Sequence, residues 1–323
     1  MLAVQAQDPR GARLAVRARS VGPTAADIDR ALTVDRSLVV GWLNRGTLHL
    51  VAVEDYWWLH SLTTPQLRTS NVTRLRQEGV GEHATELGVD LVAGALRSGP
   101  QTREQLRAVL DAAGVPTAGQ ALVHVLFATS IRGFLVRGPM VGREQAFVDP
   151  VAWIGPPGEI GLRDSLARLA RRYLVGHAPA DARDLAKWAG ITLGDARAGF
   201  DAIVDELEPW GDGLSRLSDE PEGVEMPSTR LLGSFDPILH GWRSRELLLG
   251  AHTSVVTVNG IFRPTLLVDG RVRATWTLDA RAMRLRPLES LSKTVLAEVE
   301  RECAAVQRHL GLAVTGTVVV DAK

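Results

Sequence analysis

A recurring order of capped helix, second helix and glycine-rich hairpin constrains the fold of this chain more than any other feature. In its clearest copy, Thr102 and Gln105 form a capping box that starts a helix, and Gly114 ends that helix. A second helix is expected over residues 122–129, and the Gly- and Arg-rich stretch 131–148 is typical of a β-hairpin. Two helices followed by a hairpin predict a winged helix.

The same order returns in the next part of the chain. A helix is expected over 160–173 and another over 180–188, which Gly190 closes. Thr192 and Asp195 then cap a third helix, which stands in the place of a recognition helix. Its acidic composition makes it a poor reader of the major groove, so contact with DNA and a purely scaffolding role both stay open.

The first part of the chain is interpreted as a partial winged helix. Thr24 with Asp27 caps a short helix that runs to Leu32. A second helix is predicted over 36–43, a strand over 46–51 and a third helix over 53–62.

Beyond the acidic stretch 208–227, read as a wing or linker, the periodicity changes to that of short strands, expected over 254–258, 264–268 and 271–276. Asp269-Gly270 joins the last two as a tight hairpin turn. A long amphipathic helix over 288–310 and a final strand over 313–320 complete the chain.

These elements predict an α+β protein built of tandem winged-helix modules with a C-terminal β-rich, barrel-like domain. A length of 323 residues suits two or three domains. The predicted parts are a partial first winged helix (1–87), a second winged helix (88–150), a third with its acidic wing or linker (151–227) and the C-terminal domain (228–323).

Charge is balanced overall but uneven along the chain. Lys and Arg total 37, as do Asp and Glu, whereas a general nucleic-acid binder is usually basic. Acidic residues crowd 201–225, and four arginines follow the start of the chain closely, Arg10, Arg13, Arg17 and Arg19. A local basic patch therefore keeps DNA contact open.

The single cysteine, Cys303, excludes an intramolecular disulfide and a multi-cysteine zinc site, and a buried core thiol is expected. The histidines show no metal-ligand spacing, so we expect neither a metal nor another cofactor. The chain shows no signal peptide and no apolar run long enough to span a bilayer, so a cytoplasmic protein without a membrane partner is expected.

Two glutamines near the start, Gln5 and Gln7, are spaced to act together. In an extended segment both side chains lie on one face and Ala6 points away. An amide is no general base, but its carbonyl accepts and its NH₂ donates hydrogen bonds, so a pair can orient a water molecule. On spacing alone, a solvated surface pair is the alternative. Asp8, directly before Pro9, is assigned a structural or turn role.

Segments spread in order over nearly the whole chain resemble the winged-helix family that contains the AlkZ/YcaQ-type DNA glycosylases. The matching segments are 4–10, 42–50, 171–174, 186–190, 235–237, 260–264 and 268–272. In this family the modules frame a concave surface around a Gln-aliphatic-Gln motif, which Gln5 and Gln7 match.

The resemblance implies that Gln5 and Gln7 are catalytic, positioning the attacking water and steadying an oxocarbenium-like sugar. The implied reaction is hydrolysis of the N-glycosidic bond of alkylated purines in duplex DNA, as bulky adducts or interstrand crosslinks. No lysine stands near the motif, so a monofunctional enzyme is expected, acting as a monomer. The resemblance also implies a helical segment upstream of the motif. Only four residues precede Gln5, so either the first module is incomplete or the true start lies upstream.

Six side chains are candidates for contact with DNA: Arg10, Arg13, Arg45, His49, Arg137 and Arg143. On the predicted strand, the side chains of Arg45 and His49 share parity and so lie on the same face. Packing is their alternative role. Arg137 and Arg143 belong to the predicted wing, where exposed charge often binds nothing. The alternative function is a non-catalytic winged-helix DNA-binding or regulatory protein.

Overall fold

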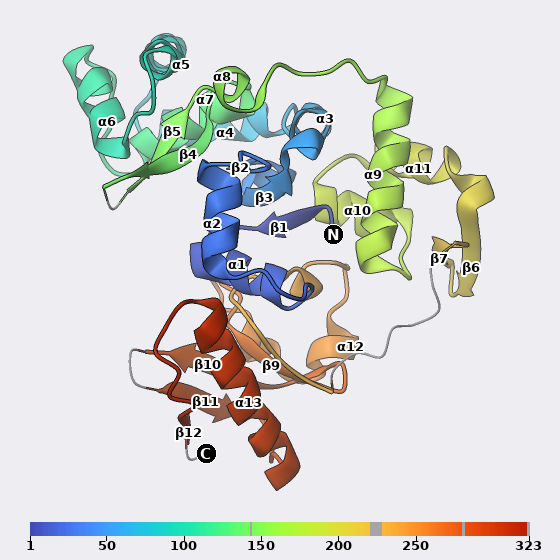
Figure 1. Cartoon of the computed structure of the whole chain (residues 1–323). Coiled ribbons are helices and arrows are strands. Elements are labelled where there is room, and N and C mark those ends of the chain that lie inside the picture. The colour runs from blue at the N-terminus through green and yellow to red at the C-terminus, as the bar shows by residue number, and fades with distance from the viewer. Residues whose placement is uncertain (143, 220–227, 280–281, 322–323) are drawn as a thin grey trace. The chain divides into compact units, whose positions relative to one another are not determined.

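The computed structural model describes residues 1–142, 144–219, 228–279 and 282–321 (Figure 1). The chain forms two compact units. Unit 1 comprises Met1–Ala3, Arg30–Gly176 and Asp181–Leu207, and unit 2 comprises Val4–Asp29, His177–Ala180 and Glu208–Lys323. The division falls inside the first strand, so both glutamines of the motif belong to unit 2.

Unit 1 contains a five-stranded sheet whose order is β1-β3-β2-β4-β5. Its strands are β1 (Ala3–Gln5, divided between the units), β2 (Leu38–Trp42), β3 (Leu48–Ala52), β4 (Val136–Val141) and β5 (Glu144–Val148). A short 3₁₀ turn, η1 (Asn44–Gly46), joins β2 to β3, which pair in antiparallel register. The two strands of the predicted hairpin, β4 and β5, are also antiparallel, as expected.

Helices occupy the rest of unit 1. Between β3 and β4 lie α3 (Val53–Thr63), α4 (Leu67–Gln77), α5 (Glu82–Arg97), α6 (Arg103–Ala112) and α7 (Ala121–Ile131). After β5 come α8 (Pro150–Ile154), α9 (Leu162–His177), α10 (Ala182–Ala189), α11 (Leu193–Asp201) and the 3₁₀ turn η2 (Val204–Glu206). Apolar side chains of α5, α6 and α7 form one buried core, which includes Val92, Leu110 and Val125.

Local capping signals predicted these helices well. Gln105 N donates to Thr102 Oγ1 over 3.2 Å and Thr102 N donates to Gln105 Oε1 over 2.7 Å, which completes the predicted capping box. Gly190 closes α10 in the left-handed conformation, and Thr192 caps α11. The order of helix, turn, helix and hairpin is present, whereas the winged-helix assignment stays a prediction.

The helix predicted over 36–43 is wrong, because this segment is the strand β2. Val39 and Val40 are β-branched and buried between the neighbouring strands β3 and β4. At Gly41, a β-carbon would come within 2.8 Å of the Tyr56 ring, so the missing side chain makes room for α3 beside the sheet. Burial in a sheet made of distant segments overrides the local helical pattern.

Unit 2 contains an open five-stranded sheet covered by one long helix (Figure 1). Its strands are β8 (Thr229–Leu232), β9 (Thr265–Val268), β10 (Arg271–Leu278), β11 (Met283–Pro287) and β12 (Val318–Val320). The strand order is β12-β11-β10-β9-β8. Its helices are α1 (Pro9–Arg17), α2 (Ala25–Thr33, which crosses into unit 1), α12 (Glu246–Leu249) and α13 (Lys293–His309), with 3₁₀ turns η3 (Pro237–Leu239) and η4 (Thr253–Val255). A separate two-stranded hairpin, β6 (Leu207–Gly211, which begins at the last residue of unit 1) and β7 (Leu214–Leu217), precedes β8 in the chain.

Side chains of α13 and the sheet share a core. Cys303 and Val299 of α13 are fully buried with Leu285 of β11 and Leu266 of β9. The expected core thiol is confirmed, and burial raises its pKa.

The described strands form an open sheet, so the barrel-like character expected of this domain is not confirmed. Two other expectations for this region are wrong. Residues 254–258 form no strand, because the chain reverses where Thr257 N donates to Ile261 O, which leaves only the bridge between Val256 and Phe262. The last strand begins at Val318 and not at residue 313, because Gln307 Oε1 accepts the backbone N–H groups of Thr315 and Gly316 and holds them in a loop.

Helix α1 lies against the end of β8 at the contact of two glycines. A β-carbon on Gly11 would come under 3.0 Å from the carbonyl oxygen of Ser234, and one on Gly233 would lie 2.9 Å from Gly11 Cα. Real β-carbons do not approach other atoms so closely, and here the neighbours are backbone atoms that cannot rotate away. The close approach of α1 to residues 233–234 therefore requires glycine at both positions.

We expect Gly11→Ala to lower the free energy of unfolding by roughly 1–3 kcal/mol, as overpacking does, despite the usual helix gain of about 1 kcal/mol. Gly94→Ala in α5 is the matched control, because its β-carbon would meet only the end of the Arg97 side chain at 3.7 Å. That variant should be neutral or slightly stabilised. Urea unfolding of both variants measures the difference, and equal effects would contradict the close approach.

Candidate functional site

The Gln5 and Gln7 side chains meet in unit 2. Gln5 Nε2 donates a short hydrogen bond to Gln7 Oε1. Gln5 is only 6% exposed, whereas Gln7 lies at the surface. The i, i+2 spacing therefore brings one buried and one exposed amide together.

One polar atom of the Gln5 amide remains unpaired. Gln5 Oε1 is buried and has no hydrogen-bond partner among the described residues. Exchanging the nitrogen and oxygen positions in both amides would leave Nε2 unpaired instead, because the pair shares one hydrogen bond. A buried polar atom without a partner costs about 1–3 kcal/mol, so it is well placed to bind a small polar molecule such as water.

Asp8 starts helix α1 directly after the pair. Its carboxylate accepts the backbone N–H of Arg10 over 3.0 Å, and Pro9 takes the first helical position, where no N–H donor is needed. The structural role assigned to Asp8 is confirmed. Because Gln7 precedes this cap, the start of α1 sets the direction in which Gln7 projects.

Two arginines of the basic segment anchor α1 and the turn after it within unit 2. Arg17 Nη2 lies 2.9 Å from Glu302 Oε1 of α13, and both side chains are largely buried. Arg19 donates two hydrogen bonds, of 2.6 and 2.9 Å, to the fully buried carboxylate of Asp236. These charges are neutralised inside the unit and do not contribute to a basic surface patch.

The other two arginines of this segment lie nearer the surface. Arg13 pairs with Asp29 and also donates to Pro9 O over 3.0 Å. Arg10 is exposed, and its guanidinium donates a long hydrogen bond of 3.4 Å to Leu278 O. Contact of either residue with DNA stays a prediction, and Arg10 needs to break no ion pair within the described structure to make it.

The predicted shared strand parity of Arg45 and His49 is wrong, because Arg45 lies in the turn η1. Its φ of 56° is left-handed, and its guanidinium donates to the carbonyl of Trp188 in α10. At Gly190 a β-carbon would meet Arg45 N at 2.9 Å, so glycine permits this packing. A tight Asn-Arg-Gly turn, not the alternation of a strand, directs the Arg45 side chain.

His49 lies on β3 and is 3% exposed. Burial first, and then the positive charge of Arg45, lower its pKa to about 3. The ring is therefore neutral at physiological pH, and its Nδ1 lies 2.9 Å from Thr47 O. An ion pair between His49 and a phosphate is not supported, and its contact with DNA stays a prediction.

The wing candidate Arg137 lies on β4 in an aromatic setting. Its guanidinium lies 4.3 Å from the centre of the Phe147 ring, and Nη1 donates to Gln145 O over 3.3 Å. Burial lowers its pKa to about 10, which leaves it charged at neutral pH. Arg143 lies outside the described residues.

Comparisons with known proteins decide the family. Residues 1–309 match the model of the family described as DNA glycosylase AlkZ-like. The chain belongs to the AlkZ-like DNA glycosylase family. A curated relative, the interstrand DNA cross-link repair glycosylase of Streptomyces sahachiroi, is 28% identical over 332 residues, 96% of this chain and 88% of that protein. The solved structure of Streptomyces sahachiroi DNA glycosylase AlkZ matches with a TM-score of 0.80 at 25% identity, covering 99% of this chain and 91% of that chain.

This AlkZ-like chain also holds a buried carboxylate in unit 1 that the sequence did not reveal. Asp55 of α3 is fully buried, and Arg168 and Arg172 of α9 each lie 2.9 Å from one of its oxygens. Trp58 Nε1 also donates to it, over 3.2 Å. The i, i+4 spacing of the two arginines was visible in the sequence, but their shared partner lies more than a hundred positions away and gave no signal.

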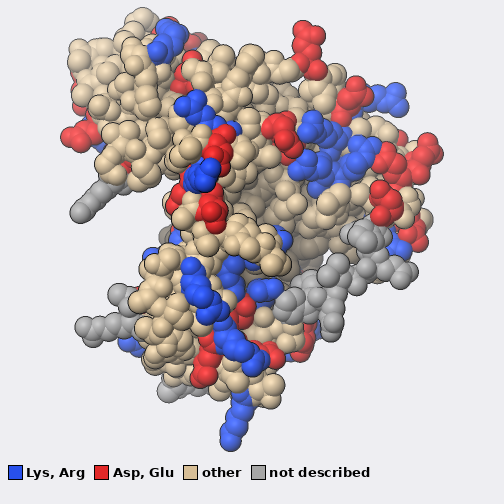
Figure 2. Space-filling view, in the orientation of Figure 1, with Lys and Arg blue, Asp and Glu red and all other residues tan. Residues whose placement is uncertain are grey.

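Charge on the visible surface is mixed. Figure 2 shows Lys and Arg side chains interspersed with Asp and Glu side chains, without one continuous basic face. Among the described residues, no group of three or more His, Cys, Asp or Glu side chains is arranged to hold a metal ion. None of the described helices combines the length and apolar character needed to cross a membrane.

We expect Arg19→Met to destabilise the protein by roughly 3 kcal/mol, because it leaves the fully buried Asp236 carboxylate without its charged partner. Arg30→Met is the control, since the pair of Arg30 with Asp35 is 68% and 45% exposed and should be worth less than about 1 kcal/mol. Chemical denaturation of both variants tests this. Similar losses in the free energy of unfolding of the two variants would show that the buried pair of Arg19 with Asp236 contributes no more than an exposed pair.

The lowered pKa of His49 predicts acid sensitivity. The unfolded chain takes up a proton near pH 6.5 whereas the folded protein does not until about pH 3, so the stability from this group is complete above 6.5 and declines as pH falls through that window. Imidazole ¹⁵N shifts recorded between pH 8 and 5 should show that His49 stays neutral. A titration midpoint near 6.5 would contradict the buried neutral ring.

Proposed function

We propose that this chain is a monofunctional DNA glycosylase that hydrolyses the N-glycosidic bond of alkylated purines in duplex DNA, with Gln5 and Gln7 holding the attacking water. The observation that carries the proposal is the unpaired, buried amide atom of Gln5 beside the exposed Gln7. The family match and the cross-link repair glycosylase among its relatives supply the reaction class.

Neutral amides suit this chemistry because the substrate is already activated. An alkylated ring nitrogen gives the purine a positive charge, which makes the base a good leaving group. The enzyme then needs to present water and stabilise positive charge on the sugar, and no strong base is required. Oxygen atoms of the two amides can accept hydrogen bonds from the water and face the developing cation with their negative dipole ends.

The buried position of Gln5 contributes preorganisation. Its amide is held by Gln7, and the chain that follows is fixed by the cap of Asp8 and by the anchored helix α1. A catalytic group held in this way loses little entropy when the substrate arrives. Interstrand crosslinks, which the relative's name specifies, are included in the proposed substrate range.

The chain's few amines favour hydrolysis over lyase chemistry. The sequence has three lysines, Lys187, Lys293 and Lys323, all far along the chain from the glutamine motif. A lyase step requires an amine that forms a Schiff base with the sugar after base release. The proposed product is therefore an abasic site in an intact strand. The chain is also proposed to act as a monomer.

The test is release of an alkylated guanine from a labelled duplex under single-turnover conditions. Gln5→Ala and Gln7→Ala should each lower the rate by about 10²–10³-fold, the range seen when a transition-state hydrogen-bonding group is removed. Gln77→Ala, which changes an exposed glutamine at the end of α4, should leave the rate unchanged.

Two outcomes would count against the proposal. Equal rates in all three variants would remove the glutamine pair from the mechanism. No release by the parent protein, together with intact folding and duplex binding, would favour a non-catalytic DNA-binding or regulatory protein.

A further inference from the structure

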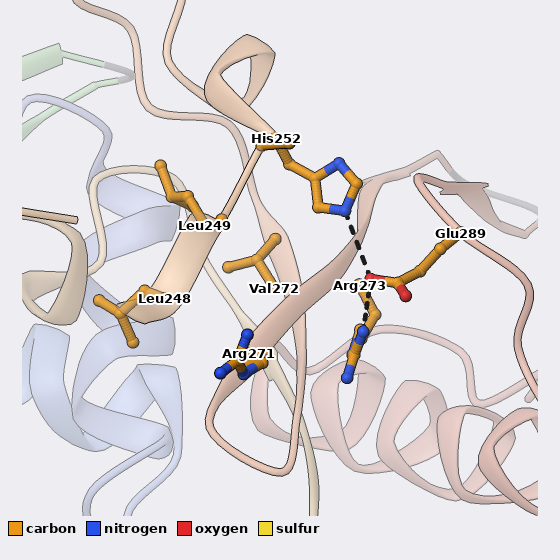
Figure 3. Close-up of a pocket in the computed structure, with 9 residues that line it drawn as sticks. Leu248, Leu249, His252, Arg271, Val272, Arg273 and Glu289 are labelled. Atoms are coloured by element: carbon orange, nitrogen blue, oxygen red, sulfur yellow. Dashed lines mark hydrogen bonds and ion pairs between the residues drawn. The ribbon is translucent and has the colours of Figure 1, made fainter. Parts of the chain in front are cut away.

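A pocket of about 180 Å³ in unit 2 lies where β10 begins, opposite α12 (Figure 3). Its walls include Leu248 and Leu249 of α12, His252, the two arginines Arg271 and Arg273, and Glu289. The volume is far above the roughly 10–15 Å³ that one water molecule needs. The pocket therefore has room for a polyatomic group.

A β-bulge places Arg273 at this pocket. The register between β10 and β9 shifts between Val272 and Ala274, so Arg273 is the extra residue without a partner in β9. Bulges redirect side chains, and here the backbone is also held where Leu288 N donates to Arg273 O over 2.9 Å. The Arg273 side chain consequently reaches Glu289, the residue after Leu288.

The one carboxylate that lines the pocket is already engaged. Glu289 Oε1 lies 2.5 Å from Arg273 Nη1 and 3.3 Å from His252 Nε2. Its pairing with Arg273 first, and its contact with His252, lower the pKa of Glu289, so the carboxylate stays ionised. Figure 3 shows both side chains converging on Glu289 while Arg271 projects separately.

Arg271 supplies the unbalanced charge. It is exposed at the start of β10, and no ion pair to it is found within the described part of the chain. Two guanidinium groups and one carboxylate line the pocket, so its lining is net positive, while Asp269 outside the lining also acts on the charge of Arg273. Arg273 also keeps N–H donors beyond the one directed at Glu289, because a guanidinium has five.

We propose that this pocket binds a phosphate group of the DNA backbone, with Arg271 as its main ligand and Arg273 as its second. A phosphate matches the charge of the two guanidinium groups and their hydrogen-bonding geometry, and the volume of the pocket admits it. The inference rests on the proposed function for its DNA substrate. It adds an anchoring contact that carries no chemistry at the glycosidic bond.

The salt dependence of duplex binding tests the contact. For B-DNA, each phosphate contact contributes about 0.9 to the slope of log K against log salt. Arg271→Gln should reduce that slope by about one, whereas Arg286→Gln should not. Arg286 is the matched control because it is an arginine of the neighbouring strand β11, 69% exposed, that does not line the pocket.

Three further arms sharpen the result. Glu289→Gln should tighten duplex binding, because it removes the negative charge that opposes a phosphate. A series of duplexes should also be compared, each with one backbone phosphate replaced by a neutral methylphosphonate. At one position this replacement should weaken binding of the parent protein but not of Arg271→Gln. Inorganic phosphate at matched ionic strength should compete with the duplex better than chloride for the parent protein but not for Arg271→Gln. Equal competition in the two proteins would overturn the phosphate site, and the absence of any sensitive methylphosphonate position would overturn the DNA assignment.

The outcomes separate this inference from the proposed function. Arg271→Gln should raise the protein concentration needed for half-saturation in the single-turnover assay, whereas Arg286→Gln should change neither that concentration nor the rate at saturation. Equal slopes for the Arg271 and Arg286 variants, with base release intact in the parent, would overturn the phosphate site alone. A selective slope change in a protein that releases no base would support the phosphate site and reject the glycosylase.

Discussion

The close approach of α1 to residues 233–234 is the constraint on which the candidate site depends. Gly11 and Gly233 let two backbones come within a distance that no other residue permits. The ion pair of Arg19 with buried Asp236, just beyond Gly233 and Ser234, closes the same junction from the other end of the helix. Because α1 begins at the cap after Gln7, this contact also fixes the position of the backbone next to the glutamine pair.

An unpaired amide atom beside such a rigid support has a physical meaning. Most buried polar atoms in folded proteins find partners, and an exception is a loss that the fold tolerates. Here the helix that follows is held by the pairs of Arg17 with Glu302 and of Arg19 with Asp236. An unsatisfied group at the end of β1, shortly before a well-anchored helix, is the pattern expected where binding, and not stability, determined the residue.

How much the sequence predicted depends on the range over which each signal acts. The capping box of Thr102 and the cap of Thr192 involve atoms three residues apart, and the structure has both. The Asp269-Gly270 hairpin was equally local, and both residues have positive φ. Segment 36–43 failed because its neighbours in the sheet come from distant positions. The pairing of Arg17 and Arg19 was not visible in the sequence for the same reason, since the carboxylates that neutralise them lie more than two hundred residues away.

This distribution of charge bears on how a chain of zero net charge can hold DNA. Arg17, Arg19, Arg168 and Arg172 all pair with carboxylates within their own units, so much of the positive charge serves folding. Nonspecific affinity for duplex DNA grows with the number of phosphates that a protein neutralises. A protein of zero net charge, whose lysines and arginines are balanced by an equal number of carboxylates along the chain, would bind undamaged duplex weakly and leave it quickly. Weak background binding suits the search for rare lesions that the proposed function requires.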